Sequence, residues 1–389
     1  MKRFIFLIPF LLNASILSEL KQKELELDKQ KSLKDAIEIK RSWINPIILK
    51  YTYQKDNVQN TLTTTHIYSL SINQPIFKSG AIYYSIKYAN KLKNYNLENI
   101  EIKKRKLIKQ AYDLVFDYNI LKLKRLIILK KIENAKIDLN RKKEEFLNGI
   151  RDSSDLDNAI IKLNSLKLSL ADIDYQISQI KYNFTNISSL NIKKIKLPKL
   201  KFISKDRYLN ENIEINSKKT LRKIKNYLYK MQIGNQLLTI SFNGSINHKN
   251  FKNRFVSDTQ NYYIAGVSVS IPFDINSKTK IQKAKIDYLK SNILLQDKKI
   301  ELINQYKTII SKISSLKNKI KIYKDNVKVY DNLLNSTIDS IKAGNATKLD
   351  LETLENSKFV NILNIKILNL QIQKELLNLY YNLVTFSNK

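Results

Sequence analysis

The chain has 389 residues, a formal net charge of +34, six glycines, five prolines and no cysteine. The missing cysteines exclude a disulfide framework, thiol catalysis and cysteine-ligated metals, and two histidines leave little for a metal cluster or a catalytic triad. So few glycines and prolines predict long uninterrupted helices. We also expect no enzyme activity, no metal and no cofactor.

The high positive charge does not by itself indicate nucleic-acid binding. Only nine of the 69 basic residues are arginine, the side chain best suited to bidentate recognition of phosphate and guanine. The lysines also spread along most of the chain instead of forming one basic tail or patch. We therefore expect no nucleic-acid partner.

Residues 1–18 have the pattern of a secretory signal peptide. Two basic residues precede the apolar run Phe4–Leu12, and small and polar residues follow it. The run is too short to cross a bilayer as a helix, and a buried N-terminal helix is the alternative. With cleavage near Ser15 or Ser18, we expect the protein to leave the cytoplasm and either stay soluble or insert into a membrane as a barrel.

Four segments alternate between apolar and polar residues, which predicts β-strands with one face of each kind. They lie at about 44–54, 64–77, 235–248 and 259–273. In the last two segments Ile240 and Val269 fall on the apolar face, whereas Ser241 and Ser268 fall on the polar face.

Charged residues are missing from three of these segments, 64–77, 235–248 and 259–273, in a chain that is 27% charged. A sheet in water carries charges on its polar face, whereas a membrane-spanning strand excludes charge from its lipid face. The charges nearby, Lys55–Asp56 and the group from Lys249 to Asp258, would then lie in exposed hairpin loops. Eight strands are about the minimum for a closed barrel, so these four predict a barrel shared by several copies.

Several aromatic residues lie near the predicted strand ends, where they suit the aromatic girdles of a membrane barrel. Ordinary β-propensity is the alternative explanation for their position. The residues are Trp43, Tyr51, Tyr53, Tyr68, Tyr262 and Tyr263.

Two long helices are predicted at about 80–148 and 277–343, each followed by a returning helix, at about 153–187 and 347–386. In the second long helix, apolar residues follow steps of three and four from Tyr306 to Ile341, with Thr337 as the interruption. Such heptads predict a coiled coil with neighbouring helices.

The two halves of the chain align at an offset of 195 residues. This offset places Ala89 on Ala284, Gly149 on Gly344 and Asp155 on Asp350. We therefore predict an internal duplication with a first repeat at 19–197 and a second at 198–389, after the signal peptide.

The long helices are preceded by the segments Ser-Ile-Asn-Gln-Pro-Ile-Phe at 71–77 and Val-Ser-Val-Ser-Ile-Pro-Phe at 267–273, and each helix is followed by a Gly-x5-Asp-Leu turn. These features resemble the TolC family of outer-membrane efflux proteins, also called outer membrane factors. The resemblance covers nearly the whole mature chain. It implies an α+β membrane protein: a homotrimer whose composite 12-stranded transmembrane barrel continues into a 12-helix coiled-coil periplasmic tunnel. The chain is short for the family, with an abbreviated leading helix at 19–41.

The resemblance also implies a function in export. The protein would sit in outer-membrane lipid with a large periplasmic portion, and would pass drugs, metals or secreted proteins together with a periplasmic adaptor (membrane fusion) protein and an inner-membrane RND or ABC transporter. The alternative is a secreted or periplasmic coiled-coil structural or adaptor protein without channel activity. An adaptor would need Gly-rich lipoyl-like and barrel domains, and a structural coiled coil would leave the uncharged strands unexplained. The sequence specifies neither the substrate nor the pump.

Site candidates follow from the same resemblance. The periplasmic gate and selectivity candidates are Asp350, Glu352 and Asp155, with Glu355 as a nearby alternative to Asp350. The adaptor-docking candidates at the helix turns are Gly149, Gly344, Asn345 and Leu351. Asp350 could instead only cap the returning helix, because a carboxylate near a helix N-terminus satisfies free N–H groups.

The closed mouth of the family is latched through a Tyr three residues before the second glycine and an Arg two residues after it. These positions are Ile341 and Ala346 here. The familiar latch is therefore absent, and we expect closure to depend on other contacts.

Overall fold

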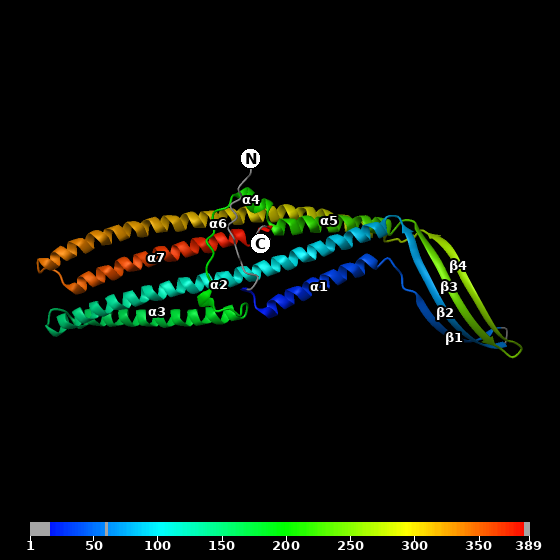
Figure 1. The fold of residues 1–389 in the computed structure, drawn as a ribbon, viewed down its shortest axis with the longest axis horizontal. Helices are drawn as coiled ribbons and strands as arrows, with labels where there is room; N and C mark the ends of the chain where they lie inside the picture. The colour runs from blue at the N-terminus through cyan, green and yellow to red at the C-terminus, as the bar shows by residue number, and fades with distance from the viewer. Residues whose placement is uncertain (1–15, 59–60, 385–389) are drawn as a thin grey trace. The chain divides into compact units, whose positions relative to one another are not determined.

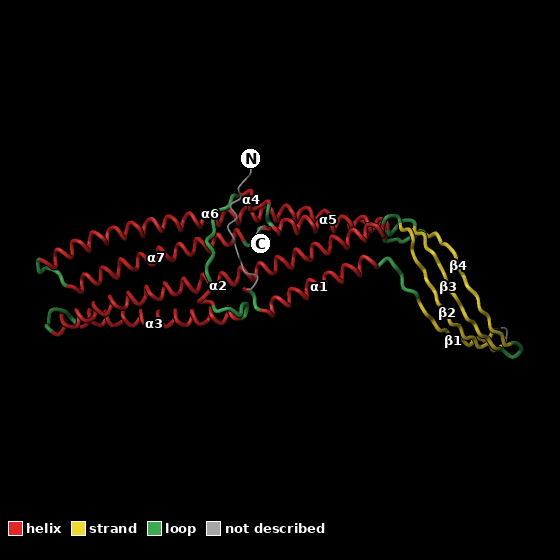
Figure 2. The backbone as a smooth tube through the Cα atoms, in the orientation of Figure 1, coloured by secondary structure: helices red, strands yellow, loops and turns green. Residues whose placement is uncertain are grey.

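The structure, a computed structural model, describes residues 16–58 and 61–384, and most of the predicted signal peptide lies outside the described residues. Figures 1 and 2 show long helices and one small sheet. The elements are α1 (Glu19–Arg41), β1 (Ile48–Val58), β2 (Thr61–Lys78), α2 (Ala81–Leu147), α3 (Ser153–Thr185), a 3₁₀ turn η2 (Ile192–Lys194), α4 (Lys205–Asn210), α5 (Ile213–Gly234), β3 (Thr239–Lys252), β4 (Ser257–Ser270), α6 (Ser277–Lys342) and α7 (Lys348–Tyr380).

The chain divides into two compact units. The sheet unit comprises Glu26–Glu101 and Glu214–Lys299 and contains all four strands, α5, most of α1 and the first parts of α2 and α6. The helical unit comprises Ile102–Ile213, the residues from Ile300 onward and the described residues up to Leu25. No helix of the described chain has an apolar stretch long enough to cross a membrane.

The four strands form one antiparallel sheet in the order β1-β2-β3-β4. Its register places Tyr51 opposite Tyr68, Tyr68 opposite His248, and His248 opposite Asn261. Both hairpins are longer than the sequence indicates, since β1 runs to Val58 and β3 runs to Lys252.

Two expectations about these hairpins were wrong. The first strand begins at Ile48 and not near residue 44, because pairing with β2 begins only there. Lys55, Asp56, Lys249 and Asp258 lie within strands and not in loops. Charged residues can occupy these positions because the hydrogen bonds between strands join backbone groups, whatever the side chain, and they continue past the uncharged segments.

The outer face of the sheet is apolar and exposed, whereas the inner face is mainly polar and is partly covered on the two central strands, β2 and β3. Leu49, Tyr263 and Val267 are 79%, 80% and 66% exposed, whereas Thr65 and Asn247 on the opposite face are only 7% and 9% exposed. A sheet that folds in water buries the apolar face instead. This inverted sheet therefore needs an apolar environment around its outer face.

The turn between β2 and α2 packs tightly against the end of α5. A Cβ atom built on Gly234 would lie 2.7 Å from the carbonyl oxygen of Ser79 and 2.8 Å from the amide nitrogen of Ala81. Both of these neighbours are backbone atoms, so they cannot move aside as a flexible side chain would. Ser79 also donates its hydroxyl to the carbonyl of Leu238 at 2.7 Å, which ties the same turn to the start of β3.

Replacing Gly234 by alanine should therefore lower the free energy of unfolding by about 1–3 kcal/mol, the usual cost of overpacking. Gly266 in β4 is the matched control, because a Cβ there meets nothing within 4 Å. Thermal unfolding of the two purified variants is the measurement. Equal stability of Gly234→Ala and Gly266→Ala would contradict the close packing of this turn.

The helical unit is held together by apolar seams. Tyr306, Ile313 and Leu316 of the predicted heptad are buried on α6. Two clusters hold α2: Ile120 and Ile127 pack with residues of α7, and farther along α2 a second cluster packs against α3. The members are Ile120, Ile127, Leu363 and Ile367 in the first cluster, and Ile132, Ala135 and Leu163 in the second.

The last helix ends at Tyr380, earlier than the expected residue 386. The chain then pairs with the segment before α5: the N–H of Ile213 donates to Asn382, and the N–H of Val384 donates to Glu211. Arg105, which is 2% exposed, donates to the carbonyls of Leu383 and Val384. Ile213 and Arg105 thus donate to carbonyls after α7, and Glu211 accepts from Val384. These bonds replace the intrahelical bonds that a longer α7 would have made.

Candidate functional site at the helix turns

The α2–α3 and α6–α7 turns have the same backbone geometry 195 residues apart. Gly149 and Gly344 have positive φ angles of 72° and 80°, a conformation that favours glycine. The N–H of each glycine donates to the residue three before it, and the next N–H donates to the residue five before itself. Both helices therefore end in a Schellman-type turn.

The returning helices are capped differently. Asp152 caps α3, since its carboxylate accepts the N–H groups of Ser154 and Asp155. Thr347 caps α7 and forms a capping box with Asp350, whose carboxylate accepts the backbone N–H of Thr347 at 3.0 Å and its hydroxyl at 2.7 Å. Asp350 thus takes part in capping α7, the alternative role that the sequence left open, and its role at a gate stays a prediction.

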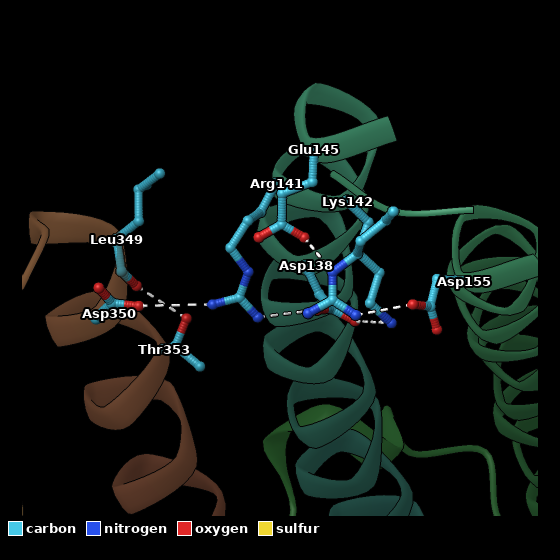
Figure 3. Close-up of polar contacts among 9 residues, drawn as sticks. Asp138, Arg141, Lys142, Glu145, Asp155, Leu349, Asp350 and Thr353 are labelled. Atoms are coloured by element: carbon cyan, nitrogen blue, oxygen red, sulfur yellow. Dashed lines mark hydrogen bonds and ion pairs between the residues drawn. The ribbon is translucent and has the colours of Figure 1, made fainter. Parts of the chain in front are cut away.

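Asp350 also faces a residue on the other helical hairpin. Arg141 on α2 places its guanidinium 3.8 Å from the Asp350 carboxylate and 3.1 Å from Asp138 one turn earlier (Figure 3). Both side chains are about half exposed. The pair thus joins α2 to the start of α7, near the two turns.

Asp155, which lies 195 residues before Asp350, is held within its own hairpin. Arg151 donates to Asp155 at 2.8 Å and to Glu145 at 2.5 Å, which ties the turn to both of its helices. The structure therefore gives the two aspartates different partners and does not bring them together with each other.

The resemblance to the family does not point to Arg141 and Arg151, because the latch of the family has its arginine at the position of Ala346. The available signal was the scarcity of arginine, because two of the nine in the chain lie within eight residues of Gly149. Of the other gate and docking candidates, Glu352 is exposed on α7 and Leu351 is half-buried. Asn345 and both turn glycines are exposed.

A groove of about 800 Å³ lies between α2, α3 and α7 behind this ion pair. Its walls include Ala135 and Leu166, and its charged residues are Lys131, Asp138, Arg141, Lys162 and Asp350. Arg141 and Asp350 both line this groove, and their ion pair links α2 to α7 at its edge.

Farther from the turns, an amide pair marks the end of the groove. Asn356, 5% exposed, donates to Asn134 at 2.8 Å, and Asn134 donates to the carbonyl of Thr353 and to Ser357. A buried amide pair in a helical seam fixes the register of two helices at a cost in stability. Beyond it the apolar cluster of Ile127 and Leu363 begins.

The pKa of Asp350 is lowered from its ordinary value, chiefly by the hydrogen bonds from Thr347 and to a smaller extent by the charge of Arg141. An acid whose pKa falls on folding contributes stability above its unfolded pKa of about 3.9 and loses it only as the pH falls through the lowered value. Mild acidification therefore leaves the cap and the ion pair intact.

The stability difference between the wild type and Asp350→Asn should accordingly stay constant from pH 8 to pH 5. It should shrink only below pH 4, where the wild-type carboxylate takes up a proton. Thermal unfolding at a series of pH values is the measurement. A difference that already changes between pH 6 and pH 7 would contradict the lowered pKa.

Comparison with known proteins agrees with this geometry. Residues 210–381 match the family model described as outer membrane efflux protein. A sequence search of curated proteins finds no match.

Solved structures share the fold at low sequence identity. VceC, an outer membrane protein of Vibrio cholerae, is 11% identical with a TM-score of 0.75, and the match covers 94% of each chain. The CmeC outer membrane channel of Campylobacter jejuni is 12% identical with a TM-score of 0.75, covering 95% of this chain and 84% of that one. CusC is 14% identical with a TM-score of 0.70, covering 94% and 92%.

The helix-rich architecture with a small antiparallel sheet is thus that of outer-membrane channels, and the matched family and structures are efflux proteins and channels, not enzymes. The resemblance stated from the sequence is confirmed: residues 210–381 match the outer membrane efflux protein family, and the fold matches solved outer-membrane channels.

Proposed function

We propose that the protein is an outer-membrane channel through which substrates are exported, assembled from three copies that share one barrel of twelve strands and one tunnel of twelve helices. The observation that carries the proposal is the inverted sheet, whose outer face is apolar and exposed and whose inner face is mainly polar. Lipid outside and water inside would satisfy both faces.

The dimensions of the sheet fit this assignment. From Asn261 in β4 to Ile271, just after the strand ends at Ser270, the chain covers ten residue steps, about 34 Å when extended at 3.4 Å per residue. At a tilt of about 40° this corresponds to about 26 Å across the membrane, close to the apolar band of about 25 Å found in such barrels. β1 and β4 are the two edges of the sheet, and edges exposed to lipid are not tolerated, so neighbouring copies would pair there.

Unpartnered stripes on the helices also support association with further copies. On α3, Ile161, Leu168, Tyr175 and Tyr182 lie seven residues apart and are between 57% and 72% exposed. Apolar residues at strict heptad spacing form the seam of a coiled coil. A single chain leaves this seam without a partner helix, which a second copy would supply.

The helix turns would form the periplasmic mouth. Asp350 would line it as a selectivity residue, and its pair with Arg141 would restrain the α6–α7 hairpin when the mouth is closed. This contact takes the place of the family latch that Ile341 and Ala346 do not provide. Leu147 and Ile150, 70% and 72% exposed beside Gly149, would offer an apolar docking point for a periplasmic adaptor that recruits an inner-membrane pump.

The proposal is tested by expressing the full chain in a bacterium with an outer membrane. We expect the protein in the outer-membrane fraction, as a trimer that migrates differently before and after heating, and we expect the purified trimer to conduct ions in a planar bilayer. A coiled-coil structural or adaptor protein would instead appear in the periplasmic or secreted fraction and conduct nothing. Cross-linking followed by identification of captured proteins would then name the adaptor.

A further inference from the structure

The register of the sheet sorts its outward residues into rows of different chemistry. Starting at the hairpin end, the first row that crosses all four strands contains Lys55, Thr64, Lys252 and Ser257, with Asn57 and Leu62 beyond it on β1 and β2. The second row contains Tyr53, His66, Asn250 and Thr259, and the third contains Tyr51, Tyr68, His248 and Asn261. The fourth row, Leu49, Leu70, Ile246 and Tyr263, begins the apolar band.

Charge is separated between the two faces at this end of the sheet. Lys55 and Lys252 are the charged residues at outward positions of the described strands. Both carboxylates of the hairpin end, Asp56 and Asp258, lie on the inner face together with Lys249. The outward face therefore presents only positive charge where the apolar band ends.

Both histidines of the chain lie on this outward face, in adjacent rows and strands. The Nδ1 atom of His66 is 2.8 Å from the Tyr51 hydroxyl, and the Nδ1 atom of His248 is 2.7 Å from the side-chain oxygen of Asn261. Stacked and tilted contacts with Tyr51, Tyr53 and Tyr68 hold the rings in place. The imidazoles are thus fixed between the lysines and the apolar rows.

A groove begins where the third row meets the fourth. It has a volume of about 580 Å³, and its outward lining includes Leu70, Ile246 and Tyr263 below His248 and Asn261. A lipid combines an apolar acyl chain with a polar headgroup. The acyl chain would fit the apolar groove, and the headgroup would lie at the polar third row, on the side of the groove toward the hairpins.

We propose that Lys55, His66, His248 and Lys252 form a headgroup belt that binds the phosphate of anionic lipids in the outer leaflet, with one acyl chain in the groove beneath His248. The belt rests on the proposed function, because only insertion of the sheet brings lipid to this face. Lysines at an anionic surface attract phosphate, and imidazole and tyrosine hydroxyl groups donate hydrogen bonds to it. The four helices that adjoin the strands, α1, α2, α5 and α6, all do so at the opposite end of the sheet, so in the proposed channel the hairpin end would face away from the periplasm.

The experiment uses the full-length protein reconstituted in phosphatidylcholine bilayers with spin-labelled lipid. Electron paramagnetic resonance measures the fraction of motionally restricted lipid at the protein surface, first with labelled phosphatidylglycerol and then with labelled phosphatidylcholine. We expect the wild type to prefer phosphatidylglycerol by about fivefold, the ratio that one well-placed lysine provides. The double variant Lys55→Gln/Lys252→Gln should bring this ratio close to one.

The matched control is Lys50→Gln/Lys249→Gln, which removes two lysines of the same two hairpins from the inner face. It should keep the wild-type ratio. The variant His66→Gln/His248→Gln should have a ratio between those of the outward and the inner lysine variants. Equal loss in the outward and inner lysine variants, or no preference in the wild type, would overturn the headgroup belt while leaving the channel proposal standing. A wild-type protein that restricts neither lipid would show that the sheet does not insert, and the proposed function itself would then fail.

Discussion

Val267→Lys should prevent most of the protein from assembling in the membrane, at a cost of about 2–4 kcal/mol in each chain. Val267 is 66% exposed on the outward face, and its row lies nearest the middle of the apolar band between Asn261 and Ile271. A lysine there places its ammonium in hydrocarbon, out of reach of either interface. Val269, one row closer to the helices, should tolerate lysine better, because the penalty falls toward the interface.

The neighbouring Ser268 provides the matched control, since its side chain lies on the inner face and bonds to Asn243 at 2.8 Å. Ser268→Lys should assemble nearly as well as the wild type. Ser241 is less suitable, because it is only 9% exposed although the sequence pattern makes it equivalent to Ser268. The measurement is the yield of heat-modifiable trimer in the outer-membrane fraction. Equal yields for Val267→Lys and Ser268→Lys would exclude a lipid-facing outer surface.

The second large effect is expected at the mouth that we propose for the helix turns. Asp350→Asn keeps an oxygen that can accept the N–H of Thr347, so α7 should still be capped, but it removes the charge that faces Arg141. Three copies of this change in a trimer should lower cation selectivity and weaken block by divalent metal ions. An exposed ion pair contributes about 0.5 kcal/mol, so the loss of three should also shift the mouth toward its open state by about tenfold.

Arg141→Gln separates these two effects, because it breaks the same pair and leaves the carboxylate in place. It should raise conductance without lowering cation selectivity. Asp339→Asn is the control, since Asp339 is 75% exposed and pairs within α6 with Lys342. Asp155→Asn should change selectivity less than Asp350→Asn, because Arg151 holds Asp155 within its own hairpin.

Single-channel recording of purified trimers in asymmetric salt provides the measurement. An unchanged reversal potential and unchanged metal block in Asp350→Asn would leave Asp350 as a helix cap alone. Unchanged conductance in Arg141→Gln would show that the ion pair does not restrain the mouth.

Local patterns in the sequence already determined much of this protein. The alternation of Ile240, Ser241, Phe242 and Asn243 assigned each residue to a face, because successive side chains of a strand point to opposite sides. The heptad from Tyr306 to Leu316 identified the buried side of α6 for a similar reason. Gly149 and Gly344 marked the two turns, since each residue there needs a positive φ angle.

Only the tertiary structure decided which distant residues meet. Asp350 and its partner Arg141 are 209 positions apart, and a pairing between two hairpins leaves no periodic signal in either one. The early end of α7 depends on Arg105, 278 positions before the carbonyl it binds. The structure also decided which charges of the hairpins lie on which face of the sheet. A shift of one residue in the strand pairing would exchange the faces of Lys55 and Asp56.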